Sequence, residues 1–462
     1  MKYLEPWKKF VPLLMPIIIW CVYSGIFING RLRVTPYNSN YFKELAISFS
    51  QGRLDIIRPF PWAHDLVFFE GKHYLYWPPV PALVYMPFTA LYGKDTPDSV
   101  ISNSFGALNV LLLIILLCLF SKRYDIKLSN AGIIFLAVFW GLGTVHFYMS
   151  MMGSVWYISQ IMAQTFLMLA VIFILVKTSS VSLFLSGLFY ALAVYTKNDL
   201  LFSIFLIAAI YITGNEIKDK KVLKRNVMLF LASFIAFSLA NMWYNLARFG
   251  NVFENGVKYH QMAPYFLENF KKHGYLSLHY VPYNFTSEVI APPLFIKQFP
   301  FFKFSPKGFG FFWASPVFVF IFAAGFYYIN EFKKHLTKQS VNTVFSRSDI
   351  IVMSGAAISG ITTAFLIFTV MGNGWVQFAS RYSLDYQLMM VLFGVFTVKI
   401  WNNNKIIKAL LIILLLFSIH MNYFGMRQYL RYENRNDSIF TTTEYQPFEL
   451  KECSNKVLEN GG

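Results

Sequence analysis

The sequence predicts an all-α polytopic membrane protein with about eleven transmembrane helices. Hydrophobic residues make up 56% of the 462 residues and charged residues only 14%, whereas soluble globular chains carry about 25% charged residues. Apolar runs near the roughly 20 residues that cross a bilayer recur along the chain. The formal net charge is +17, but Lys and Arg fall mainly in short loops between these runs, as in cytoplasmic membrane loops. The basic charge therefore does not indicate a nucleic-acid partner.

The first apolar run, 11–28, follows Lys8 and Lys9 and resembles a signal peptide. No small-x-small cleavage site follows it, so we expect it to remain as the first helix. The other expected spans lie near 100–120, 130–149, 156–177, 181–196, 199–214, 227–246, 312–330, 349–371, 385–400 and 406–423. The two runs beside Lys197-Asn198-Asp199 are short, so ten or twelve spans are alternatives to eleven.

Basic loops orient these spans. With an internal N-terminus and eleven crossings, all four basic loops fall on the cytoplasmic side. They carry Lys122, Arg123 and Lys127; Lys218, Lys220, Lys221, Lys224 and Arg225; Lys333, Lys334, Lys338 and Arg347; and Lys405 and Lys408. Segments 30–98, 247–311 and 372–384 and the polar tail 427–462 are then external. One transmembrane domain, 1–426, in the plasma or inner membrane is the simplest description.

The first external segment contains a short apolar run, 82–87, preceded by Pro78, Pro79 and Pro81. This run is too short and too rich in proline to span a membrane, so we expect an interfacial helix there. The second external segment mixes Phe, Tyr, Pro and Lys, as in 295–307. Such mixtures suit the headgroup zone, where aromatic rings and long basic side chains are stable.

Polar clusters occur in three segments that this topology places near one face, 52–74, 244–250 and 373–385. An ionised group near the bilayer costs a few kcal/mol. We therefore expect these clusters to form a shared site at the external face.

Five groups of motifs run along most of the chain. They are Asn40-Tyr41-Phe42 to Gly52-Arg53-Leu54; His64-Asp65-Leu66 with Gly71-Lys72-His73-Tyr74 and Pro78-Pro79-Val80-Pro81-Ala82-Leu83; Gly143-Thr144-Val145-His146 with Gly153-Ser154-Val155-Trp156; Tyr244-Asn245 with Arg248-Phe249-Gly250; and Gly374-Trp375-Val376-Gln377-Phe378 with Arg381-Tyr382-Ser383-Leu384-Asp385. In these motifs the chain resembles the GT-C superfamily of integral membrane glycosyltransferases, which use polyprenyl-phosphate-linked sugars. It is most similar to a group of uncharacterised bacterial members.

The resemblance implies a GT-C-like fold and an acidic general base in the first external loop, because a sugar hydroxyl is a poor nucleophile until its proton is taken. Many members carry an acid shortly before the aromatic pair, where this chain has Asn38, Ser39 and Asn40. Asp65 is the first substitute, since it matches the acid of the closer bacterial relatives. The alternative is that Asp65 only caps a turn. The remaining candidates are Asp55 and Glu70.

The resemblance also implies basic residues that hold the departing lipid phosphate. Arg381 is the best candidate, because guanidinium binds phosphate oxygens at two points. An ion pair with Asp385, one helical turn later, is its alternative role, and both can hold. Lys72 and Arg248 are weaker candidates, because interfacial cations commonly just extend toward headgroups. The further candidates for substrate contacts are His64, Gln377, Asn245 and Trp375, although amides more often satisfy neighbouring protein groups.

No cofactor is indicated, and His146 and His260 lack the spacing of a metal motif, so a divalent metal has no support from the sequence. The predicted function is an inverting glycosyltransferase that moves a monosaccharide from a polyprenyl phosphate to a glycan or lipid-linked acceptor. The alternatives are a transporter or flippase of lipid-linked substrates and a glycan polymerase or ligase. A transporter would carry charged or broken spans near the bilayer midplane.

Overall fold

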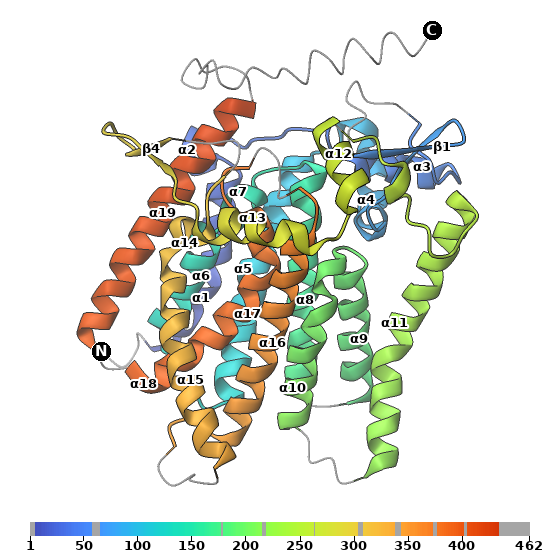
Figure 1. The fold of residues 1–462 in the computed structure, drawn as a ribbon. Helices are drawn as coiled ribbons and strands as arrows, with labels where there is room; N and C mark the ends of the chain where they lie inside the picture. The colour runs from blue at the N-terminus through green and yellow to red at the C-terminus, as the bar shows by residue number, and fades with distance from the viewer. Residues whose placement is uncertain are drawn as a thin grey trace.

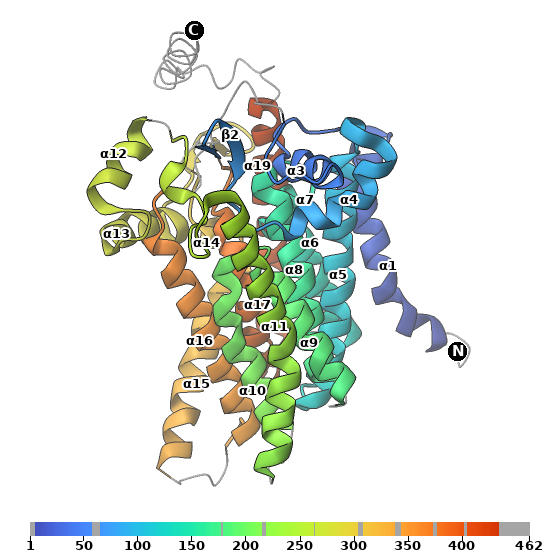
Figure 2. The ribbon, with the colours of Figure 1, turned by 90° about the vertical axis from the view of Figure 1, so that its right-hand side faces the viewer.

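The computed structural model describes residues 5–57, 65–176, 179–214, 219–262, 264–303, 308–337, 343–372, 377–401 and 404–433. These residues form a bundle of long helices that run side by side, with smaller elements gathered over one end (Figures 1 and 2). We refer to that end as the cap end. It contains the parts of the polar segments that bear the predicted site.

The bundle contains α1 (Glu5–Tyr23), α5 (Asp98–Arg123), α6 (Asn130–Leu142), α8 (Val155–Leu175), α9 (Ser180–Val194), α10 (Ile204–Gly214), α11 (Lys220–Phe249), α15 (Phe320–Leu336), α16 (Arg347–Thr369), α17 (Leu384–Gly394), α18 (Val398–Trp401) and α19 (Lys405–Glu433). Within the described ranges, six helical stretches are long and apolar enough to cross a membrane, and four apolar helices are shorter. The expected number of eleven spans is therefore not confirmed. Helix α19 also continues beyond residue 427, where we expected the polar tail to begin.

The smaller elements are α2 (Ile26–Asn29), α3 (Tyr41–Ser50), β1 (Leu66–Phe69), β2 (Lys72–Leu75), α4 (Val80–Tyr92), α7 (His146–Ser150), α12 (Pro264–His273), α13 (Val281–Phe285), β3 (Leu294–Phe295), β4 (Phe302–Lys303) and α14 (Phe311–Ala314). Helix α4 includes the proline-rich run expected to be interfacial and extends further, with Pro81 in its first turn, where a missing N–H costs nothing. It packs against α3 at the cap end.

Strands β1 and β2 form an antiparallel hairpin, with Leu66 opposite Leu75 and Phe69 opposite Lys72. Glu70 and Gly71 connect them with φ values of 48° and 75°. Two consecutive residues with positive φ match the right-handed twist of a two-residue hairpin. The strands thereby place Asp65 at one end of the hairpin and Glu70 at the other.

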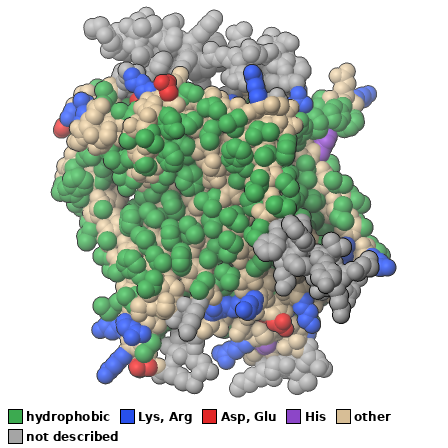
Figure 3. Space-filling view, turned by 180° about the vertical axis from the view of Figure 1, so that it is seen from behind, with side chains coloured by type: hydrophobic (Ala, Val, Ile, Leu, Met, Phe, Trp, Pro, Cys, Tyr) green, Lys and Arg blue, Asp and Glu red, His purple; other side chains and the backbone are tan. Residues whose placement is uncertain are grey.

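The surface of the bundle is apolar where its helices face outward. Ile235 on α11, Ile361 on α16 and Leu416 on α19 are 54%, 69% and 62% exposed. Figure 3 shows a broad hydrophobic band across the middle of one face, with Lys and Arg gathered mostly at the end opposite the cap. Soluble monomers rarely expose apolar patches of this extent. The chain is a multi-pass membrane protein.

Apart from Lys127, in the loop after α5, the described basic residues of the four loops belong to helix ends opposite the cap. These are the C-terminal ends of α5 and α15 and the N-terminal ends of α11, α16 and α19. They therefore share one side of the bundle. That this side faces the cytoplasm stays a prediction from the distribution of charge.

A buried ion pair joins the first external segment to the bundle. Asp98, at the start of α5, accepts hydrogen bonds from Lys43 Nζ at 2.8 Å, Asn40 Nδ2 at 2.7 Å and the Tyr37 amide at 2.6 Å. The side chains of Lys43 and Asp98 are 3% and 0% exposed. Asn40 also caps α3 by accepting from the Lys43 amide. The resemblance leads us to expect an acid at residues 38–40. In this chain Asn40 is instead part of this structural cluster.

We expect Lys43→Met to lower the free energy of unfolding by about 3–5 kcal/mol, because it leaves the Asp98 charge buried without its cation. Titration of the purified protein with a denaturing detergent would measure the change. Lys272→Met is the matched control: Lys272 and Glu268 form an exposed pair, so the loss should stay within about 1 kcal/mol. Equal losses for the two variants would contradict the structural role of the buried pair.

Candidate functional site

Asp65 immediately precedes β1, which lies at the cap end of the bundle. Its φ of 68° is in the left-handed region, which Asp tolerates better than most residues. Its carboxylate contacts two other parts of the chain. Trp156 Nε1 donates a hydrogen bond to Oδ2 at 2.8 Å, and His260 Nε2 lies 3.6 Å from Oδ1. The carboxylate is therefore held by groups from α8 and from the second external segment.

The approach of these two residues follows from local backbone contacts. Trp156 is in the first turn of α8. His260 follows a 3₁₀ turn and forms an isolated antiparallel bridge with Val67 of β1, and the next amide, of Gln261, donates to the Leu66 carbonyl at 2.9 Å. The strand that begins after Asp65 therefore also fixes the position of His260.

Burial raises the pKa of the Asp65 carboxyl, but His260, Trp156 and Arg381 together outweigh it and lower the pKa below its usual value. The carboxylate is therefore ionised at neutral pH. The effect of Arg381 also shows that the two best sequence candidates, for the base and for the phosphate ligand, lie within electrostatic reach of each other.

Arg381 begins the 3₁₀ turn that leads into α17, and it is buried. One guanidinium nitrogen donates to the Tyr382 hydroxyl at 3.3 Å, and the guanidinium carbon lies 5.0 Å and 5.5 Å from the ring centroids of Tyr382 and Tyr157. Nε has no hydrogen-bond partner among the described residues. Gln377 accepts from the Arg381 amide at 3.3 Å, which fixes the start of the turn. Arg381 is thus a cation placed among aromatic rings, with one donor that no described residue accepts from.

Asp385 is fully buried and pairs with Lys197 rather than with Arg381. Lys197 Nζ lies 3.5 Å from Asp385 Oδ2 and 2.7 Å from Asp199 Oδ2. Gln160 Nε2 links the two candidates by donating to Asp385 Oδ2 at 3.1 Å and to the Arg381 carbonyl at 3.2 Å. The prediction of an ion pair between Arg381 and Asp385 is therefore wrong. Lys197, which lies between α9 and α10, pairs with Asp385 instead.

Lys197 and Asp199 lie where α9 ends and the 3₁₀ turn Asn198–Ser203 leads into α10. The 15 residues of α9 and 11 of α10 are few for a span of roughly 20 residues. The chain therefore turns within the bundle, and charged side chains at this break remain near α8 and α17. Lys197 and Asp199 thus interrupt the apolar sequence between these two helices.

Arg248 and Asn245, near the end of α11, are engaged in structural contacts. Arg248 donates to the Leu75 carbonyl at 2.6 Å, to Asn245 Oδ1 at 2.9 Å and to the Tyr244 carbonyl at 3.3 Å. Its guanidinium carbon also lies 3.7 Å from the centroid of the Tyr244 ring. Asn245 Nδ2 donates to the Val252 carbonyl. This guanidinium fastens β2 to α11, which leaves it less suited to bind a phosphate.

Among the remaining candidates of the first external segment, Glu70 and Lys72 lie apart from Asp65. Glu70 and Lys72 are exposed at the opposite end of the hairpin, and the four residues of β1 separate them from Asp65 by roughly 13 Å. Asp55 pairs with Arg53, and this hydrogen bond is the main cause that lowers the pKa of its carboxyl. His64 and Trp375 lie outside the described residues.

His146 belongs to a buried network with Tyr23, Asn109 and Ser150, at distances of 3.1–3.3 Å from its ring nitrogens. Within the described ranges, no three His, Cys, Asp or Glu side chains gather as a metal centre. We therefore describe the site through its protein groups.

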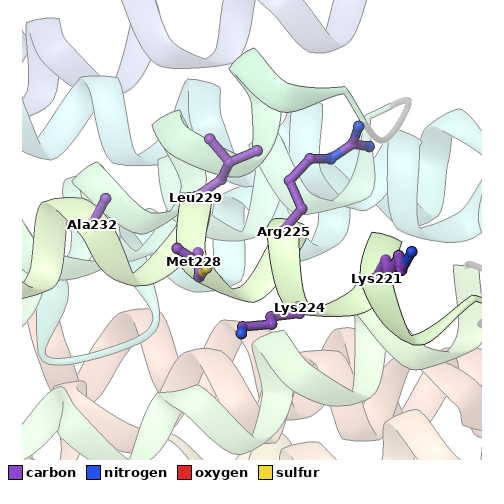
Figure 4. A pocket seen from close by; sticks show the side chains of 6 residues that line it. All are labelled: Lys221, Lys224, Arg225, Met228, Leu229 and Ala232. Carbon is purple, nitrogen blue, oxygen red and sulfur yellow. The ribbon is translucent and has the colours of Figure 1, made fainter.

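A surface hollow of about 480 Å³ lies on α11 far from Asp65. Figure 4 shows the α11 side chains that line it: Lys221, Lys224, Arg225, Met228, Leu229 and Ala232. Between Lys224 and Arg248 the helix rises by roughly 36 Å, so the hollow lies at the basic end of the bundle. None of its lining residues is acidic, and it is not part of the site.

Sequence reasoning missed Gln160, Lys197 and Asp199, and it considered His260 only as a metal ligand. A signal for Lys197 and Asp199 existed, because two charges between two short apolar runs are costly unless they are paired or used. For His260 and Gln160 there was none, since their contacts depend on segments distant in the chain.

No family model and no curated protein matches this chain. Among solved structures, it is similar to the crystal structure of the Archaeoglobus fulgidus oligosaccharyltransferase in the apo form, with 12% sequence identity and a TM-score of 0.49. The similarity covers 92% of this chain and 56% of that chain, so this chain spans little more than half the length of that protein. The likeness is too remote to assign a fold or a function.

We expect Lys197→Met to lower the free energy of unfolding by about 3–5 kcal/mol, because Asp199 and Asp385 would lose their shared cation. Adding Asp385→Asn should recover part of that loss, since it removes one of the two stranded charges. Denaturing-detergent titrations of the wild type, both single variants and the double variant would give the coupling energy. If the two changes add within about 0.5 kcal/mol, the pair does not interact as described.

Proposed function

We propose that this protein is a membrane glycosyltransferase that moves a monosaccharide from a polyprenyl-phosphate donor to a glycan or lipid-linked acceptor at the external face. The observation that supports it best is the placement of the Asp65 carboxylate within electrostatic reach of a buried guanidinium, that of Arg381, whose Nε has no hydrogen-bond partner among the described residues. In this proposal, residues 1–426 form one catalytic membrane domain of the plasma or inner membrane, with the N-terminus in the cytoplasm.

The proposed reaction is a single displacement with inversion at the anomeric carbon. The acceptor oxygen forms the new bond to that carbon, and the bond between the carbon and the phosphate oxygen breaks with its electron pair on the phosphate. Asp65 takes the proton of the acceptor hydroxyl as general base. Arg381 stabilises the negative charge that grows on the departing lipid phosphate. One proton and one sugar are transferred, so no further reactant is needed.

The surroundings of the two residues support these roles. Trp156 fixes one carboxylate oxygen of Asp65 and leaves the other facing His260. The aromatic rings of Tyr157 and Tyr382 hold the guanidinium of Arg381 without neutralising its charge. A catalytic group gains from such fixed placement because little reorganisation is needed when charge develops.

The position at the end of an apolar bundle supports a lipid-linked donor. A polyprenyl chain would remain among lipid tails beside the exposed apolar helices, and its phosphate would lie at the level of the interface. A sugar on that phosphate would reach the cap end, where Asp65 lies.

The second candidate function is a transporter or flippase of lipid-linked substrates. The charges of Lys197, Asp199 and Asp385 at the break between α9 and α10 favour it, because ionisable groups and broken helices inside a bundle occur along transport pathways. We prefer the glycosyltransferase, because Lys197 pairs with both carboxylates of this group inside the protein, whereas Nε of Arg381 has no hydrogen-bond partner among the described residues. A polymerase or ligase would use the same two residues and differ only in the transferred glycan.

We expect Asp65→Asn and Arg381→Ala each to lower transfer at least a hundredfold, because each removes a charge used in the transition state. Detergent-purified protein would be given radiolabelled polyprenyl-phosphate monosaccharides, with membrane extract as the acceptor source. Glu70→Gln is the control, since Glu70 is exposed at the far end of the hairpin, and it should retain wild-type turnover.

Full activity of Asp65→Asn would exclude Asp65 as the base and leave Asp55 for the same test, whereas loss of turnover in Glu70→Gln would identify Glu70 as the base. Turnover only with oligosaccharide donors would identify a polymerase or ligase. No transfer with any donor, together with substrate-dependent movement across sealed vesicles, would establish the transporter instead.

A further inference from the structure

We propose that His260 is a positioning residue for Asp65 that must be neutral for turnover and that accepts from Asp65 the proton released by the acceptor hydroxyl. This inference rests on the proposed function, and it adds a third residue to the site. It is drawn from the contact between two external segments that lie far apart in the sequence.

His260 lies beside Asp65, and its two ring nitrogens make no hydrogen bond within the described residues. Its Nε2 lies 3.6 Å from Asp65 Oδ1, and its side chain is only 10% exposed. Neither ring nitrogen has a hydrogen-bond partner among the described residues. Buried side-chain nitrogens are usually hydrogen-bonded, so a buried imidazole whose nitrogens make no hydrogen bond within the described part of the chain is unusual. A separation just beyond hydrogen-bond length is typical of catalytic pairs before substrate binds.

The ring is held in place by its surroundings. The centroid of the Tyr76 ring lies 4.7 Å from that of His260, with an angle of 44° between the planes. The bridge to Val67 fixes the backbone on the side of β1. Because Trp156 occupies Oδ2 of Asp65, Oδ1 is the oxygen that faces the imidazole. The imidazole is therefore positioned to act on one oxygen of the carboxylate.

The contact between His260 and Asp65 offers a route for the proton that the acceptor hydroxyl loses in the reaction. When the acceptor oxygen bonds to the anomeric carbon, its proton passes to Asp65. A neutral imidazole then takes the proton through Nε2, which restores the carboxylate and leaves an imidazolium beside it. The bond that breaks leaves its electrons on the lipid phosphate. An imidazolium present before the reaction would instead pair with the carboxylate and leave no base to receive this proton.

The other groups around the pair keep a constant charge near neutral pH. Tyr76 faces His260, and Tyr41, Tyr275 and Arg381 interact electrostatically with Asp65. Burial is the main cause that raises the pKa of the three tyrosines, so they stay neutral, and the guanidinium stays charged. Burial raises the pKa of Asp65, but its contacts with His260, Trp156 and Arg381 lower it below the usual value.

The test compares rates of transfer between pH 5 and 8.5 for the purified full-length wild type, His260→Gln and the control His279→Gln. His279 is an exposed histidine of the same external segment and lies apart from Asp65. The wild type and the control should lose activity toward acid pH. His260→Gln can still hydrogen-bond Asp65 but cannot take its proton. Its kcat should fall by roughly ten- to a hundredfold, with the KM for the donor unchanged and the acid limb absent.

Thermal unfolding and size-exclusion profiles would show whether His260→Gln is folded. If it is not, His260→Ala with added imidazole replaces it, and restoration of transfer by imidazole at pH 8 is the expected result. Wild-type kcat with an intact acid limb in a folded His260→Gln would overturn the inference while leaving Asp65 as the base, as would failure of imidazole to restore His260→Ala. Absence of transfer by the wild type with every donor would overturn the proposed function, and this inference with it.

Discussion

A charge inside an apolar bundle must be paired or hydrogen-bonded, since burying it alone costs several kcal/mol even after the surroundings relax. The described part of the chain meets this constraint in three ways. Lys43 and Asp98 neutralise each other, Lys197 is shared by two carboxylates, and Arg248 is surrounded by carbonyls and an aromatic ring. These contacts also tie segments together: α3 to α5, the α9–α10 break to α17, and β2 to α11.

The same constraint separates structural charges from candidate catalytic charges. Arg381 and Asp65 are each held by aromatic or weakly polar contacts, and Nε of Arg381 has no hydrogen-bond partner in the described part of the chain. A substrate that carries a phosphate and a hydroxyl would supply what they lack. Arg248 shows the contrast, because a guanidinium that donates to two carbonyls and an amide has little to offer a ligand.

The site is assembled from segments that the membrane topology returns to one end. Asp65 belongs to the first of the external segments defined above, His260 to the second and Arg381 to the third. Helices in antiparallel succession bring each of these segments to the cap end, where a bridge between Val67 and His260 joins the first two. Trp156, in the first turn of α8, connects them to the bundle. A rigid set of helices can in this way position loops that are far apart in the sequence.

The sequence by itself determined the helical membrane class, the basic loops and the polar segments, because hydropathy and charge act locally along the chain. It also indicated Asp65 and Arg381, through motif resemblance rather than contacts. Only the tertiary structure decided the pairings: Asp385 with Lys197 instead of Arg381, Arg248 with backbone carbonyls, and His260 with Asp65. The number of spans was also beyond local reasoning, because α9 and α10 are short where buried charges meet. Pairings of this kind depend on which helices pack together, and the hydrophobic pattern of one helix does not show which other helix packs against it.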